Sequence, residues 1–270
     1  MKYGLIAGNG RFPVLALESA RKLGHEVVAV GIQEEASKEI EAAASRCYWI
    51  SLGQLSRLIE ILKQEGIQEV ILAGQVKHAK IFSGILPDWR LVKLLASLPE
   101  KNTAALIGGV AKVLEQEGIR LVDSTVFLKP LLAGEGVLTA RKPTREELAD
   151  IDYGRKAANA LSGFDVGQSV AICERACVAV EAMEGTDAML RRAASLSNGR
   201  PLRLVKAGRR REHLLFDVPV AGPDTIPVMV ETRTTALGVD AGRTLLLDRE
   251  QMLRAADEAG IAILGYPPTE

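Results

Sequence analysis

The first half of the chain alternates short apolar segments with amphipathic ones, and this alternation limits the fold more than any other feature. Apolar runs at 2–7 and 69–73 are each followed by glycine, a third run spans 26–32, and segments with helical periodicity separate them. A further strand of this half is expected at 120–126. Strands that alternate with helices pair in parallel, and uniformly apolar strands need cover on both faces. Residues 1–130 are therefore predicted to form an α/β, Rossmann-like domain with a parallel sheet.

The second half has a different pattern, which begins after a glycine-containing linker at 131–142. Thr144 and Glu147 have the spacing of a capping box, which starts a helix. The segments 169–173 and 176–181 predict a β-hairpin that turns at Glu174 and Arg175. Strands and helices then mix to the end of the chain, so residues 143–270 are predicted to form an α+β domain with a mixed sheet. We expect the ligand to bind between the two domains.

Two glycine turns follow apolar strands of the first domain. Gly8-Asn9-Gly10 comes after the first strand, and Gly74-Gln75 comes after the strand at 69–73. Ligands of such sheets bind at the carboxyl ends of the strands, so both turns are expected on one rim that holds a nucleotide. The alternative is a pair of tight turns without a ligand. An NAD-dependent oxidoreductase is disfavoured, because Pro13 occupies the place of the third glycine of the dinucleotide fingerprint.

Glu184-Gly185-Thr186-Asp187 stands where a strand pattern changes to a helix pattern. The unpaired N–H groups of a helix N-terminus favour anions, and paired carboxylates there can bind a hard divalent cation. An anion site next to metal ligands suits a phosphate or pyrophosphate reaction. The alternative is ordinary capping, with Thr186 as the N-cap.

Asp217 follows a run of apolar residues and precedes Val218-Pro219. A carboxylate in an apolar strand is costly unless it is paired or ligated, which makes Asp217 a catalytic candidate. The alternative is an Asp that starts a turn. Lys206 ends another apolar segment and is a candidate counter-charge for an anion.

Composition excludes several classes of protein. Lysines plus arginines and aspartates plus glutamates each number 34, so no net charge favours nucleic acid. No apolar run is long enough to span a bilayer. The cysteines Cys47, Cys173 and Cys177 show no zinc spacing, and the last two are expected to be buried free thiols. A cytoplasmic protein is expected, and the sequence leaves open a homodimer.

Several segments, in this order along nearly the whole chain, match one family. They read GLIAGNGRFP, LAGQVKH, GEGVLTARKPTREELADIDYG, FDVGQSVAI, VAVEAMEGTDAML, FDVPVAGPDTI and GVDAGRTLLLDRE. The sequence thereby resembles the LpxI-type UDP-2,3-diacylglucosamine pyrophosphatases of lipid A biosynthesis. The resemblance implies metal-dependent hydrolysis to UMP and 2,3-diacylglucosamine 1-phosphate (lipid X), with Mg²⁺ as the usual metal and with water directed at the sugar-side phosphorus. It also implies an acylated UDP-sugar as substrate and peripheral, transient contact with the inner-membrane surface.

The resemblance and the chemistry of the residues together assign a site. Asp217 is expected to be catalytic, and Glu184, Asp187 and Asp217 are expected to hold the metal. The expected substrate-binding residues are Gly8, Asn9, Gly10, Gly74, Gln75, Asn102, Gln168, Gly185, Thr186 and Lys206.

One motif departs from the family pattern. Family members carry a Gln-Asp pair and an Arg before the Phe-Asp-x-Pro motif, whereas this chain has Glu212, His213 and Leu215 there. If the catalytic Asp of the family is the surviving one, it is Asp217. If it is the lost one, His213 stands in its place. The alternative function is therefore a protein of the same fold that binds a nucleotide-sugar or lipid without catalysis or with altered specificity.

Overall fold

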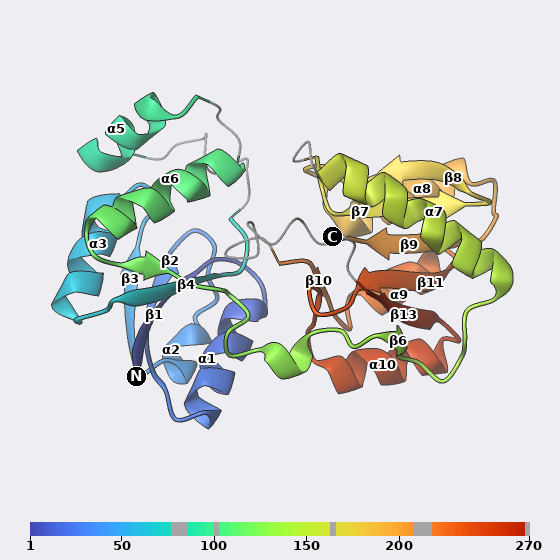
Figure 1. The fold of residues 1–270 in the computed structure, drawn as a ribbon, viewed down its shortest axis with the longest axis horizontal. Coiled ribbons are helices and arrows are strands. Elements are labelled where there is room, and N and C mark those ends of the chain that lie inside the picture. Colours follow the sequence, from blue (N-terminus) through green and yellow to red (C-terminus); the bar gives the residue numbers. More distant parts are fainter. Residues whose placement is uncertain (77–85, 100–102, 163–165, 208–217, 268–270) are drawn as a thin grey trace. The chain divides into compact units, whose positions relative to one another are not determined.

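The structure is a computed structural model that describes residues 1–76, 86–99, 103–162, 166–207 and 218–267. The chain divides into two compact units, Met1–Leu128 and Lys129–Glu270. Each unit has a central sheet with helices around it (Figure 1).

The sheet of the first unit is entirely parallel, in the order β3-β2-β1-β4-β5. Its strands are β1 (Lys2–Ala7), β2 (Glu26–Ile32), β3 (Arg46–Ile50), β4 (Glu69–Ala73) and β5 (Arg120–Leu121). The helices α1 (Phe12–Lys22) and α2 (Ile40–Ala43) pack together on one face. The opposite face is covered by α3 (Leu55–Gln64) and α6 (Thr103–Gln116), and α5 (Trp89–Ser97) packs on these two helices (Figure 1).

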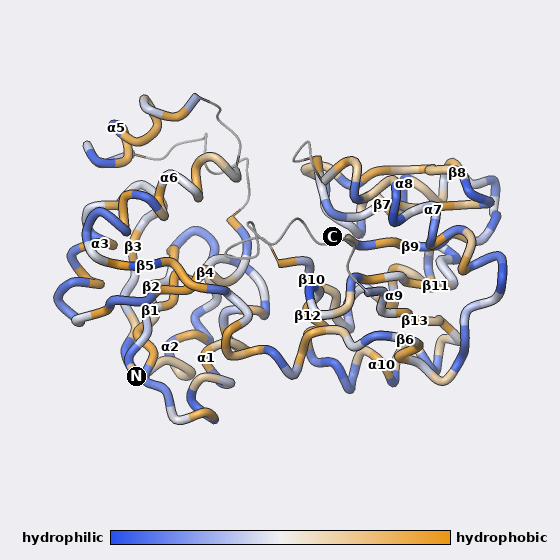
Figure 2. The backbone as a smooth tube through the Cα atoms, viewed as in Figure 1, coloured by the Kyte–Doolittle hydropathy of each residue, from blue (hydrophilic) through white to orange (hydrophobic). Residues whose placement is uncertain are grey.

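This arrangement confirms the predicted Rossmann-like sheet. Strands β2 and β4 are hydrophobic along most of their length (Figure 2), and side chains such as Leu5, Val28 and Ile71 are completely buried. Burial on both faces explains why the sequence shows continuous apolar runs rather than alternation. The predicted strand at 120–126 is shorter than expected, because Asp123 accepts hydrogen bonds from the backbone N–H and the hydroxyl of Thr125 and so forms a turn.

The second unit has a six-stranded mixed sheet in the order β6-β13-β11-β9-β7-β8, which confirms the predicted α+β domain. The strands β9 (Leu202–Lys206), β11 (Thr234–Asp240) and β13 (Ala262–Tyr266) are parallel. The hairpin β7 (Ser169–Cys173) and β8 (Ala176–Val180) joins antiparallel to β9, and β6 (Gly136–Val137) joins antiparallel to β13. Two short strands, β10 (Val220–Ala221) and β12 (Leu245–Leu246), pair separately. A 3-10 helix, η1 (Lys129–Leu131), begins this unit.

Within the described residues of this unit, one helix covers one face of the sheet and three cover the other. α7 (Arg145–Ser162) packs on β7, β9 and β11. It approaches closely, since a Cβ on Gly154 would lie 2.6 Å from Val205 and a Cβ on Gly238 of β11 would lie 2.4 Å from Ile151. α8 (Thr186–Leu196), α9 (Thr225–Glu231) and α10 (Arg249–Glu258) share the core of the other face.

The capping box at the start of α7 is confirmed. Glu147 accepts from the Thr144 N–H at 2.8 Å, and the Glu147 N–H donates to the Thr144 hydroxyl at 3.2 Å. Glu147 also binds both terminal nitrogens of Arg141 at 2.9 Å, while the Arg141 Nε donates to the Gly260 carbonyl. The motif segment around 134–154 therefore fixes the start of α7 to the amino ends of the parallel strands.

The expectation for the thiols is correct for Cys173 and wrong for Cys177. Both are free cysteines, but Cys177 is exposed because it lies on β8, the edge strand of the sheet. Within the described ranges, no helix has both the length and the apolar character needed to cross a membrane.

Candidate functional site

The carboxyl ends of the parallel strands in the second unit bring several polar side chains to one edge. Lys206 ends β9, Asp240 ends β11 and Tyr266 ends β13. Ser169 begins the antiparallel β7 and pairs with Lys206 in the ladder. These four residues therefore lie along the same edge, although they are separated by up to about a hundred residues of sequence.

Lys206 is held at this edge by uncharged oxygens. Its Nζ donates to Thr186 Oγ1 at 3.1 Å and to the Val220 carbonyl at 2.8 Å. Thr186 in turn donates to Glu181 Oε1 at 2.9 Å and lies 3.5 Å from Ser169 Oγ. In the part of the chain that the structure describes, no carboxylate lies within ion-pair distance of the Lys206 ammonium. An ammonium without a carboxylate partner among the described residues is suited to bind an incoming anion.

The turn before α8 leaves the helix N-terminus without a side-chain cap. Gly185 is the N-cap, with φ of +84°, and among the described residues no side chain accepts a capping hydrogen bond there. The interpretation of Thr186 as N-cap is wrong, because Thr186 is the first helical residue and its hydroxyl binds Lys206 and Glu181 instead. The N-terminal N–H groups and the helix dipole thus add positive potential beside Lys206.

Glu184 and Asp187, the two acids of this turn, differ in whether their carboxylates are free to bind a metal ion. Glu184 forms an ion pair with Arg192 at 2.6 Å and accepts the Ala182 N–H at 3.0 Å. Hydrogen bonding from its own backbone N–H and from Arg192 holds the pKa of Glu184 below its usual range. Asp187 is exposed at the first turn of α8.

These residues do not make a complete metal site. Within the described ranges, no three acidic, histidine or cysteine side chains gather in a metal-binding group. Asp187 fits a hard cation as a single carboxylate ligand. Glu184 fits only if it releases Arg192. Asp217, the third expected ligand and the expected catalytic residue, lies outside the described residues, as does Asn102.

Gln168 lies at the same edge and contributes through its backbone. Its carbonyl accepts the N–H of Ala207 at 2.9 Å, which continues the β7–β9 pairing past Lys206, and its side chain is half-buried.

A second polar cluster at this edge was missed by the sequence analysis. Asp240 is only 2% exposed, and its carboxylate lies 3.9 Å from the Arg155 guanidinium of α7. The same guanidinium lies 4.3 Å from the centre of the Tyr266 ring. Burial, together with the negative charge of Asp152, raises the pKa of the Tyr266 phenol. The available signal was an Asp that closes an otherwise apolar strand, which is the argument that selected Asp217.

In the first unit, the two glycine turns lie side by side as expected. Asn9 and Gln75 form an antiparallel bridge, with N–H···O distances of 2.7 and 3.1 Å. A Cβ on Gly8 would lie 2.6 Å from the Gln75 carbonyl oxygen, and one on Gly74 would lie 2.4 Å from the Asn9 carbonyl oxygen. The close contact between the two turns therefore explains why positions 8 and 74 are glycine, and this explanation requires no bound ligand. Gly10 is exposed, with φ of +94°, and no described residue lies within 4 Å of the position that its Cβ would take.

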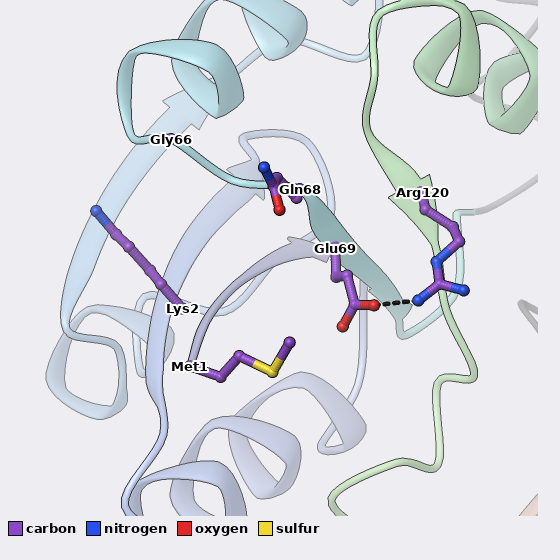
Figure 3. A pocket seen from close by; sticks show the side chains of 6 residues that line it. All are labelled: Met1, Lys2, Gly66, Gln68, Glu69 and Arg120. Carbon is purple, nitrogen blue, oxygen red and sulfur yellow. Dashed lines mark hydrogen bonds and ion pairs between the residues drawn. The ribbon is translucent and has the colours of Figure 1, made fainter.

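A crevice of about 340 Å³ lies at the opposite, amino-terminal edge of this sheet (Figure 3). Its lining comes from Met1, Lys2, Gly66, Gln68, Glu69 and Arg120. Glu69 is bound by Arg120, and Lys2 is paired with Glu65 at 2.8 Å. Because these charges are already neutralised, the crevice is a poor candidate for an anionic ligand.

Comparison with known proteins gives a full-length match. Residues 2–138 match the LpxI N-terminal domain, and residues 134–264 match the LpxI C-terminal domain. The chain is 32% identical over 279 aligned positions to the UDP-2,3-diacylglucosamine pyrophosphatase LpxI of Caulobacter vibrioides, covering 100% of this chain and 99% of that relative.

Similarity to solved structures is weak. A pyruvate carboxylase from Rhizobium etli (11% identity, TM-score 0.30) matches 63% of this chain and 14% of its own. Glycinamide-RNase-transformylase T from Mycobacterium tuberculosis (15% identity, TM-score 0.29) matches 63% of this chain and 38% of its own. Similarity at this level has no bearing on function.

Proposed function

The chain belongs to the LpxI family, and on this premise we propose that it hydrolyses the pyrophosphate bond of UDP-2,3-diacylglucosamine. The products are UMP and 2,3-diacylglucosamine 1-phosphate. The chain is then a hydrolase that acts on a phosphoric anhydride in lipid A biosynthesis. The full-length match to a relative of that activity supports the proposal.

The structural observation that carries the proposal is the position of Lys206. Its ammonium lies beside the uncapped N-terminus of α8 and is held by the oxygens of Thr186 and Val220. A fixed cation next to helix N–H groups stabilises the charge that develops on a phosphoryl oxygen during hydrolysis. Lys206, Gly185 and Thr186 are therefore assigned to the pyrophosphate.

The water and its proton are assigned to Asp217. In the proposed reaction, water attacks the sugar-side phosphorus, Asp217 accepts the proton, and the bridging oxygen leaves with UMP. A divalent metal, Mg²⁺ in our proposal, neutralises phosphate charge when it is bound. Mg²⁺ typically takes one or two carboxylates and completes its shell with water and substrate oxygens. Asp187 and Asp217 are the proposed ligands, joined by Glu184 if its pair with Arg192 opens.

The remaining assignments concern the uridine and the acyl chains. Asn9, Gly10 and Gln75 offer backbone and amide groups on the carboxyl rim of the first unit, where we propose that uridine binds. Gly8 and Gly74 hold this rim together, and Asn102 and Gln168 complete the proposed substrate contacts. We further propose that residues 1–130 bind the uridine side of the substrate and that residues 143–270 carry the catalytic chemistry. The protein is proposed to work on the cytoplasmic side in transient contact with the inner membrane.

A second function is a non-catalytic or altered-specificity protein that binds a nucleotide-sugar or lipid. The observation that favours it is the presence of Glu212, His213 and Leu215 where the family has its Gln-Asp and Arg.

One assay separates the two functions. Purified protein is incubated with detergent-dispersed UDP-2,3-diacylglucosamine and Mg²⁺ in ¹⁸O-water, with and without EDTA, and UMP is measured. The proposal expects UMP release that EDTA abolishes and excess Mg²⁺ restores, with ¹⁸O in 2,3-diacylglucosamine 1-phosphate. Saturable binding of the substrate without UMP release supports the second function. Incorporation of ¹⁸O into UMP contradicts the proposed attack at the sugar-side phosphorus.

A further inference from the structure

Helix α5 of the first unit has apolar side chains on two sides, with Leu94 directed toward the protein and Trp89 and Val92 directed outward. Trp89, Val92 and Ala96 are all exposed, and their spacing places them along one stripe of the helix. Trp89 is 67% exposed and Val92 49%, while Leu86, just before the helix, is 92% exposed. The outer face of a surface helix in a water-soluble domain is normally polar.

The polar contacts of α5 hold this orientation. Asp88 caps the helix by accepting the Leu91 N–H at 2.9 Å, and its other carboxylate oxygen accepts the Ser56 N–H of α3 at 2.6 Å. Arg90 is paired with Glu117, which follows α6. The exposed apolar stripe is therefore a fixed feature of the surface.

The inner side of α5 packs closely against α6. Leu94 is only 7% exposed, and a Cβ on Gly109 of α6 would lie 2.6 Å from its methyl carbon. The core thus uses the Leu94 side of the helix and leaves the Trp89 side without a partner in the described structure. Hydrophobic residues recur along both α5 and α6 (Figure 2).

We propose that the face of α5 formed by Leu86, Trp89, Val92 and Lys93 docks on the surface of an anionic phospholipid bilayer. This inference rests on the proposed function, because an enzyme that takes a diacylated substrate from a membrane has to reach the headgroup region. It goes further by assigning the contact to one helix face.

The charge and chemistry of the side chains on this face favour a lipid surface as its binding partner. The exposed Lys93 lies with its Nζ 5.7 Å from the centre of the Trp89 ring, which combines an aromatic side chain with a cation. Such pairs suit the headgroup layer, where the ring is partly buried and the ammonium meets lipid phosphate. The described parts of 86–117 hold three basic residues, Arg90, Lys93 and Lys112, and three acids, Asp88, Glu115 and Glu117. Asp88 is bound by two N–H groups and Glu117 is paired with Arg90 and Lys63, so the charge beside Trp89 is the exposed ammonium of Lys93.

Other exposed large apolar residues provide a matched control. Leu196, at the end of α8, is 58% exposed and Val230, on α9, is 56% exposed. Both lie in the second unit, away from α5 in sequence, and neither belongs to the proposed site.

The test measures flotation with vesicles of phosphatidylethanolamine and phosphatidylglycerol (3:1), and with phosphatidylcholine vesicles as the neutral comparison. The wild type is expected to float with the anionic vesicles. The double variant W89S/V92S is expected to weaken partitioning about tenfold or more, since each buried side chain of this size contributes substantially. The variant K93E changes only charge, so it is expected to weaken binding to anionic vesicles about tenfold and to leave binding to neutral vesicles unchanged. The control L196S/V230S is expected to bind as the wild type does.

A fluorescence readout locates the contact. The chain has two tryptophans, and Trp49 is occupied by a hydrogen bond to Glu41 at 2.7 Å. In a W49F background, the emission of Trp89 is expected to shift to shorter wavelength when anionic vesicles are added. An unchanged spectrum in a variant that floats places the contact elsewhere and overturns the proposal.

Hydrolysis of detergent-dispersed substrate separates this inference from the proposed function. If the wild type hydrolyses the dispersed substrate but does not float, or if W89S/V92S floats as well as L196S/V230S, the docking face is wrong while the enzyme assignment stands. If W89S/V92S instead converts a dimer to a monomer in sedimentation without an effect on flotation, the face binds a second copy and the membrane proposal is overturned. If the vesicle results hold but no variant hydrolyses the substrate, the docking face stands and the proposed reaction fails.

Discussion

Replacement of Lys206 by methionine tests the proposed site most directly. The change keeps an unbranched chain of similar length and removes the ammonium beside α8. Loss of one preorganised charge-stabilising donor costs about 2.7–4 kcal/mol at the transition state, which is a fall of about 10²–10³ in kcat. The two hydrogen bonds to Thr186 and Val220 are lost as well, and together they contribute about 1–3 kcal/mol to stability.

The two effects are measured separately. UMP release gives kcat and KM, and urea unfolding gives the free energy of unfolding. Lys156→Met removes an exposed ammonium from α7 and serves as the matched control. Lys206→Arg keeps the charge and is expected to retain more activity than Lys206→Met. If Lys206→Met remains folded and its kcat lies within about twofold of that of Lys156→Met, Lys206 does not act on the pyrophosphate.

Three further substitutions test other parts of the structure. Asp217→Ala is expected to lower kcat by at least about 10²-fold with unchanged circular dichroism, and wild-type turnover would remove Asp217 from the mechanism. Gly74→Ala is expected to destabilise the first unit, because the residue has φ of +86° and the new Cβ meets the Asn9 carbonyl, whereas an unchanged melting temperature would show that the two turns can separate. Hydrogen bonds from Lys2, Tyr48 and Arg46 lower the pKa of Glu65 to about 2, so its contribution to stability is present above the unfolded-state pKa and is lost as the pH falls from about 4.5 to about 2. Glu65→Gln is therefore expected to lower the melting temperature at pH 7 and to flatten its acid dependence, and an acid profile identical to that of the wild type would contradict the assignment.

The sequence predicted the sheets well because their signals are local. Continuous apolar strands that end in glycine, such as 69–73, require a sheet covered on both faces, and the structure has that sheet. The hairpin at 169–180 was predicted equally well from the sequence, and Glu174 and Arg175 at its turn have left-handed backbone conformations. The strand predicted at 120–126 was too long, because Val126 continues the apolar pattern after the chain has already turned at Asp123.

The contacts of the candidate site were harder to predict from the sequence, because they join segments that are far apart along the chain. Thr186 was interpreted through the helix that it begins, whereas its hydroxyl binds Lys206, twenty residues later, and Glu181 on the other side of the turn. Likewise, the Arg155–Asp240 contact joins α7 to the end of β11. No local periodicity predicts such pairs, because strand order and register decide them.

The motif segments shared with the family divide into two physical groups once strand direction is known. Glu184–Asp187 and the segment around Asp240 lie at the carboxyl edge of the second sheet, with Lys206. The longest match, around 134–154, lies at the opposite end, where Arg141 and Glu147 join the start of α7 to the strands. Ligands of open α/β sheets bind at carboxyl edges, so the first group is the one to search for substrate contacts. The second group supports that edge from a distance, because α7 continues from it to Arg155, whose guanidinium lies 3.9 Å from the Asp240 carboxylate. A residue in a matching motif can therefore be assigned a role in the reaction only when the structure shows at which end of the strands it lies.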